Sequence, residues 1–88
     1  MLWSEVRKKL PNKWLVVETI AARPAGEGRL LEDVAVIEES EDGWVAMERQ
    51  SAWQRQWPDR EFHSVHTDQA MPVIREKPML GIRGIRWN

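Results

Sequence analysis

The sequence predicts an α+β fold, in which a four-stranded, mostly antiparallel sheet carries one main helix (about 43–57) on one face. Residues 43–57 have the spacing of an amphipathic helix, and the segments on both sides of it are rich in β-branched and aromatic residues. The chain of 88 residues has the length of one domain. We therefore expect a single two-layer domain over residues 1–88, with elements in the order (α)ββαββ.

The composition excludes several classes of protein. The chain has no cysteine, which removes disulfides and thiolate metal sites. No apolar run approaches the roughly 20 residues that cross a bilayer, and the N-terminal residues lack the features of a signal peptide. A formal net charge of −1 gives no global attraction to nucleic acid. We expect a cytoplasmic protein with no membrane contact, and we predict no cofactor and no metal.

A domain this small has a thin core and usually needs an additional source of stability. Without disulfides or a metal, the remaining sources of stability are tight packing and self-association. The six tryptophans are many for this length, and each buries roughly 150–250 Å² when it is enclosed. We expect some of them to lie at an interface between subunits.

Residues 2–10 have the pattern of a short helix that ends before Pro11, and residues 13–22 have the pattern of the first strand. Both alternating sets of side chains in this strand are largely apolar, which is typical of a strand covered on both faces. Because one helix covers only one face, we expect a second copy of the chain on the other. The candidate interface residues are Trp14, Val16 and Ile20.

The turn residues of segment 23–29 separate the first strand from a second strand at 30–39, so the two should form an antiparallel hairpin. Ser40 or Asp42 is expected to cap the main helix. One face of that helix, which we expect the sheet to cover, consists of Ala46, Met47, Gln50, Trp53, Gln54 and Trp57.

A third strand is predicted at 61–67, an irregular or extended connection at 72–78 and a fourth strand at 79–87. A right-handed crossover through the main helix places the third strand beside the first and parallel to the second. The fourth strand should then pair with the third. The expected order across the sheet is second, first, third, fourth.

Four blocks of the sequence resemble a family of small, uncharacterised ("hypothetical") bacterial proteins. The blocks are PNKWLVVE at 11–18, DVAVIEES at 33–40, WPDREFHSVHT at 57–67 and LGIRG at 80–84. The resemblance covers about residues 3–84. It implies a bacterial, cytoplasmic origin and one compact α/β unit. It implies no activity and no site residues.

Segment 60–68 is the richest in groups that can take part in chemistry, with two histidines, a serine and two carboxylates. His63 and His66 should point to opposite faces of a strand, because their spacing is odd. A single metal ion held by both is therefore not expected, and catalytic residues stay unassigned. A small hydrolase or nuclease that uses this stretch is the second alternative function.

Glu18 lies within an otherwise apolar strand and needs a partner, because an isolated buried charge is unfavourable. His66, Arg83 and Arg60 are the candidate partners. A cluster of Glu18, His66 and Arg83 is the best polar pocket that the sequence offers, and it would make the protein a small-ligand or nucleic-acid binder. This is the first alternative function.

Charge is unevenly distributed along the chain. Residues 18–48 contain nine acids against two arginines, whereas both ends are basic. Such segregation favours self-association or contact between the ends and the body. The sequence is best explained as a non-enzymatic interaction module that forms a homodimer, with an unidentified protein partner as a further possibility and nucleic acid disfavoured.

Overall fold

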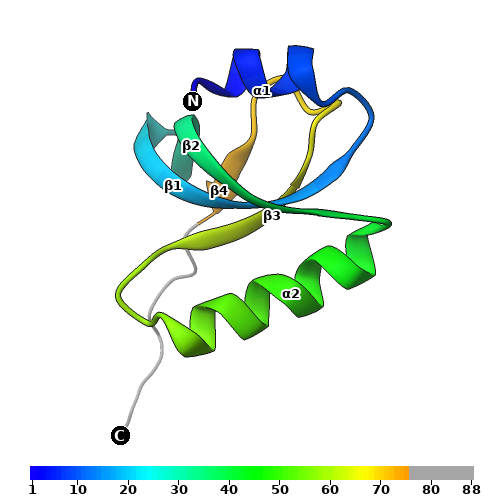
Figure 1. The fold of residues 1–88 in the computed structure, drawn as a ribbon. Coiled ribbons are helices and arrows are strands. Elements are labelled where there is room, and N and C mark those ends of the chain that lie inside the picture. Colours follow the sequence, from blue (N-terminus) through cyan, green and yellow to red (C-terminus); the bar gives the residue numbers. More distant parts are fainter. Residues whose placement is uncertain (76–88) are drawn as a thin grey trace, which may run out of the picture.

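The computed structural model describes residues 1–75 and confirms the α+β prediction (Figure 1). Four antiparallel strands form one sheet, and the order across it is β3-β1-β2-β4. The elements are α1 (Trp3–Lys9), β1 (Trp14–Ala25), β2 (Gly28–Ser40), α2 (Gly43–Gln56), β3 (Phe62–His66) and β4 (Val73–Arg75).

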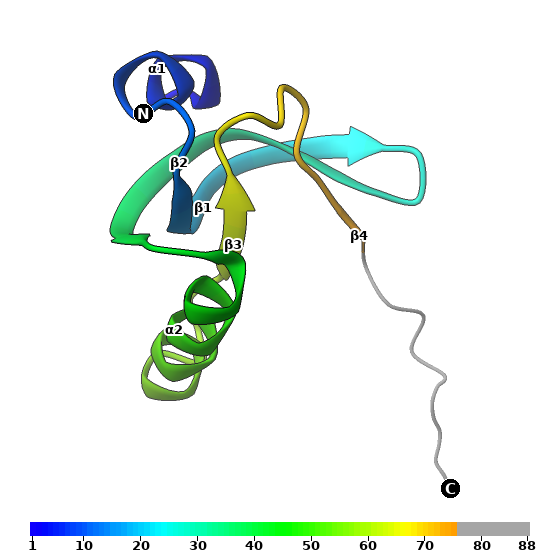
Figure 2. The same cartoon turned by 90° about the vertical axis from the view of Figure 1, so that its right-hand side faces the viewer.

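Strands β1 and β2 form a long hairpin joined by a tight turn at residues 26–27. Gly26 adopts a φ of +61°, which a glycine reaches without steric cost. The register shifts at three places, between Val16 and Val17 and on both sides of Ala21. Such bulges bend and twist a hairpin, and both strands curve strongly along their length (Figure 2).

The third strand lies where the sequence predicted, beside β1 and antiparallel to it, with Trp14 opposite His66 and Glu18 opposite Phe62. The fourth strand predicted at 79–87 lies outside the described residues. A short strand within the expected connection, β4, pairs with β2 through residues 28–30. The pairing of the 79–87 strand with the third strand therefore stays a prediction.

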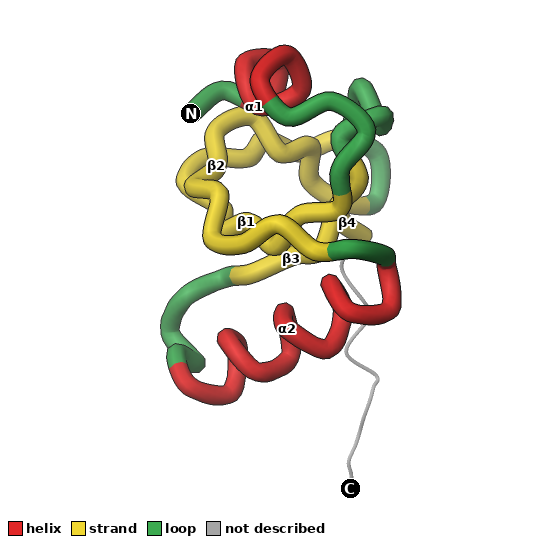
Figure 3. Tube along the Cα trace, turned by 45° about the vertical axis from the view of Figure 1, so that its right-hand side comes forward, coloured by secondary structure: helices red, strands yellow, loops and turns green. Residues whose placement is uncertain are grey.

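The curved sheet encloses the main core, and α1 closes one end of it (Figure 3). Leu15 and Val17 of β1 are fully buried here and belong to one cluster with Trp3 and Val6 of α1. Helix α1 is held to the loop after β3, because Trp3 Nε1 donates to Gln69 O at 2.8 Å. The expectation that this face of β1 needs a second copy to cover it is wrong, since the chain covers it itself.

Helix α2 covers the other face of the sheet and runs beside β3. Its predicted bounds and its N-cap are confirmed, since Asp42 Oδ1 accepts a hydrogen bond from Val45 N at 2.9 Å. Gly43 begins the helix directly against Trp14, where a Cβ atom would lie 2.9 Å from Trp14 Cζ2. Ala46 is fully buried below the sheet, but Met47 is 57 % exposed and lies beside Trp44, so the expectation that the sheet covers Met47 is wrong. No helix in residues 1–75 has the length and apolar character needed to span a membrane.

Candidate functional site

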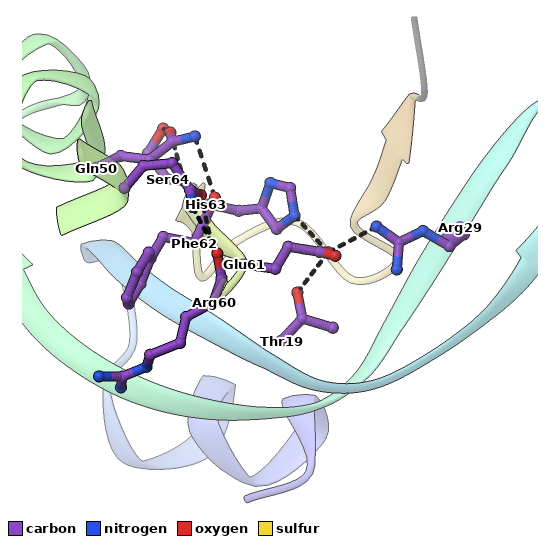
Figure 4. A network of polar contacts seen from close by, with 9 residues as sticks. Thr19, Arg29, Gln50, Arg60, Glu61, Phe62, His63 and Ser64 are labelled. Carbon is purple, nitrogen blue, oxygen red and sulfur yellow. Dashed lines mark hydrogen bonds and ion pairs between the residues drawn. The ribbon is translucent and has the colours of Figure 1, made fainter. Parts of the chain in front are cut away.

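A polar cluster around Glu61 lies on the face of the sheet opposite α2 (Figure 4). One carboxylate oxygen, Oε2, accepts hydrogen bonds from Thr19 Oγ1 at 2.9 Å and Arg29 Nη2 at 2.6 Å. The same oxygen lies 2.8 Å from His63 Nε2. Side chains from β1, β2 and β3 therefore meet at the carboxylate of Glu61, the residue before β3.

The environment of Glu61 favours its charged form. Burial raises the pKa of this carboxyl group, but the hydrogen bonds from His63, Arg29 and Thr19 outweigh burial and lower the pKa to about 2. Because Oε2 of the charged carboxylate joins side chains from β1, β2 and β3, we assign the cluster to fixing the register of these strands.

Glu18 faces α2, and its partner is Arg60. The two side chains form a bidentate pair, with Arg60 Nε 2.8 Å from Oε2 and Nη2 2.6 Å from Oε1. Hydrogen bonding to Arg60 lowers the pKa of Glu18 from its ordinary value. The guanidinium also lies over the rings of Trp57 and Phe62, at 5.5 and 5.2 Å from their centroids. The sequence correctly included Arg60 among the partners of Glu18.

The remaining members of the predicted pocket do not join this pair. His66 lies four residues further along β3 from Phe62, opposite Trp14, and their rings meet edge to face at 5.2 Å. Its Nδ1 accepts a hydrogen bond from Asp68 N at 3.1 Å. Arg83 lies outside the described residues. Glu18 and His66 are therefore separated by roughly 13 Å of strand and form no common pocket.

The two histidines lie on opposite faces of β3, as their spacing predicted. His63 faces the Glu61 cluster, whereas His66 faces α2. Among residues 1–75, no group of three His, Cys, Asp or Glu side chains is placed to hold a metal ion. The polar side chains of segment 60–68 therefore lie on two different faces of the sheet, one at the Glu61 cluster and the other toward α2.

The outer edge of β3 is closed by two glutamines of α2, of which Gln50 is labelled in Figure 4. Gln50 donates to Phe62 O at 3.1 Å and accepts from Ser64 N at 3.0 Å. Gln54 accepts from Phe62 N at 3.2 Å and also donates to Arg60 O. The side-chain amides take the place of a further strand and satisfy edge groups that would otherwise be open to another chain.

Helix α2 has a second face, which points away from the sheet. Trp44, Met47, Glu48 and Ser51 line an open hollow on it, and Trp44 is 71 % exposed. At about 100° per residue, these positions lie opposite the sheet-facing residues Ala46 and Gln50. We call Trp44, Met47, Glu48, Ser51 and Arg55 the outer face of α2.

The candidate interface residues of β1 lie in three different settings. Val16 is fully buried on the α2 side, opposite Ser64, and Trp14 is half-buried against Gly43. Ile20 is 58 % exposed and is the additional residue of a bulge between Thr19 and Ala21. Of the three, only Ile20 presents a largely exposed side chain.

The sequence reasoning missed the outer face of α2. The signal was present, because Trp44, Met47, Glu48, Ser51 and Arg55 recur at intervals of three and four residues. It was hidden because the opposite face of the same helix carries Trp53 and Trp57, which gave the stronger apolar pattern.

Comparison of the chain with protein-family models, with curated proteins and with solved structures finds no match. No relative therefore supplies a function by similarity. The resemblance of four sequence blocks to a bacterial family stays a prediction.

Proposed function

We propose that the protein is a non-enzymatic, cytoplasmic interaction module that self-associates, and that the contact is made by the outer face of α2. The single observation that carries the proposal is the exposure of Trp44 and Met47, at 71 % and 57 %, side by side on one helix. Aromatic residues and methionine are the types most enriched where proteins bind one another.

Other surfaces that could bind a second copy are already occupied by contacts within the chain, which supports the outer face of α2 as the contact surface. The apolar face of β1 is buried in a core that includes residues of α1, β2 and β3, and Gln50 and Gln54 satisfy the edge of β3. The carboxylates of Glu18 and Glu61 are engaged by arginines from the same chain. The outer face of α2 thus stands out because the described residues leave its two large apolar side chains, Trp44 and Met47, exposed.

Light scattering coupled to size-exclusion chromatography tests the proposal. We expect the wild-type protein to have the mass of a dimer at micromolar concentration. A double variant, Trp44→Ser with Met47→Ser, should shift the mass to that of a monomer, because exposed side chains are removed without touching the core.

Met71→Ser is the matched control, since Met71 is 64 % exposed in the loop between β3 and β4. It should leave the mass unchanged. A wild-type monomer across the micromolar range would reject the proposal.

A further inference from the structure

We infer that two copies of the chain pair through α2 in antiparallel orientation, with a two-fold axis passing between Ser51 and Ala52. This inference rests on the proposed function and adds the geometry of the contact. A two-fold axis brings the same surface of both copies together, so that surface must complement itself. The outer face of α2 meets this requirement in charge and in shape.

The charges on the outer face complement each other across such an axis. Glu48 and Arg55 lie two helical turns apart, and both are exposed. Within residues 1–75, neither side chain forms an ion pair or a hydrogen bond. An axis midway between the two positions brings Glu48 of each copy to Arg55 of the other. A parallel pairing in register would instead place Glu48 beside Glu48.

The size of the side chains also fits an antiparallel crossing. Ser51 and Ala52 lie at its centre, and such small residues let two helices approach to about 8–10 Å. Trp44 and Met47 lie one to two turns from the centre, toward the N-terminal end of α2. In the pair Met47 lies opposite Gln56, at the C-terminal end of the second helix, and Trp44 lies opposite Asp59, just beyond that end.

Charge reversal tests the pairing. Glu48→Arg and Arg55→Glu should each weaken dimerisation at least about tenfold at low ionic strength, because each places like charges together twice. The double variant Glu48→Arg with Arg55→Glu restores opposite charges and should bring the dissociation constant back to within about threefold of the wild type. Sedimentation equilibrium measures all four proteins, and Glu27→Arg in the β1–β2 turn is the control.

A single introduced cysteine gives an independent measurement. The chain has none of its own, so Ser51→Cys should yield a disulfide-linked dimer on mild oxidation, whereas Ser4→Cys on α1 should not. Both serines are exposed, and neither substitution disturbs the core.

The outcomes separate this geometry from the proposed function. A dimer that survives both charge reversals and gives no Ser51→Cys cross-link would overturn the pairing and leave self-association standing. A wild-type monomer would overturn both. A monomer whose Ser51→Cys thiol reacts slowly with a soluble reagent would place another segment of the same chain on this face, which also overturns the pairing.

Discussion

Gln50 of α2 binds Ser64 of β3 through one amide oxygen, which accepts from both the backbone N–H at 3.0 Å and the hydroxyl group at 2.8 Å. The nitrogen of the same amide donates to Phe62 O. Helix and strand are thus joined by hydrogen bonds of the kind that normally join two strands. This relationship explains how a mostly polar helix is held against an edge strand.

The first prediction concerns this contact. Gln50→Leu keeps the size of the side chain but leaves Phe62 O and Ser64 N without their partner, which should cost about 1–3 kcal/mol of unfolding free energy. Urea denaturation measures the change. Gln56→Leu is the control on the same helix, because Gln56 is exposed, and its cost should stay within about 0.5 kcal/mol. Equal costs for the two variants would show that the edge contact contributes nothing.

The second prediction follows from the low pKa of Glu61, about 2 in the folded protein. A lowered pKa stabilises the fold above the unfolded value near 4.5, and this contribution is lost as the pH falls from about 4.5 toward 2. Glu61→Gln should therefore cost about 1 kcal/mol at pH 7, a modest value because solvent partly screens the group. The difference from wild type should shrink below pH 4.5.

Thermal unfolding across pH 2–7 measures this dependence, with Glu27→Gln as the exposed control. A Glu61→Gln penalty that is the same at pH 7 and at pH 2 would contradict the assigned cause of the shift.

The third prediction concerns Gly28, where β2 meets β4. A Cβ atom at this position would lie 2.2 Å from Ile74 O, which is backbone and cannot move aside cheaply. Gly28→Ala should release β4 and speed exchange of the Leu31 amide hydrogen, which is bonded to Pro72 O at 3.1 Å. Gly26→Ala is the control, because it has open space and only the cost of a positive φ, about 1–2 kcal/mol. Leu31 exchange that is unchanged in Gly28→Ala would refute the close approach.

The fourth prediction concerns Glu18 and Arg60. If the pair is structural, Glu18→Leu and Arg60→Leu should each destabilise the fold, and the double variant should lose less than the two single losses combined. Denaturation of the four proteins gives the coupling energy. A coupling of zero, together with unchanged stability, would revive a ligand-binding role for Glu18.

Local patterns in the sequence predicted the elements well. The main helix follows from its N-cap Asp42 and from the apolar spacing up to Trp57, and β1 to β3 follow from their β-branched residues. The position of β3 beside β1 follows from the handedness of a single crossover. These features depend on neighbours in the chain or on a general topological rule, so one sequence suffices.

The features that were missed depend on residues far apart in the chain. Strand β4 has three residues after Pro72 and is recognisable only from its pairing with β2. The Glu61 cluster needs Thr19 and Arg29, which lie 42 and 32 residues away. The burial of β1 in one core with α1 depends on how sharply the bulges bend the hairpin. No local sequence pattern predicts that bend.

The glutamine contacts between α2 and β3 also set a limit on strand length. Every fourth residue of α2 contacts every second residue of β3. Four residues of helix advance about 6.0 Å, whereas two residues of strand advance about 6.6 Å, so successive contact positions fall out of step by about 0.6 Å each time. Two consecutive contacts tolerate this mismatch, but a longer series would not. The positions one repeat beyond are Ala46 and Pro58, neither of which has a side-chain amide. A strand guarded in this way must stay short, and β3 ends after five residues.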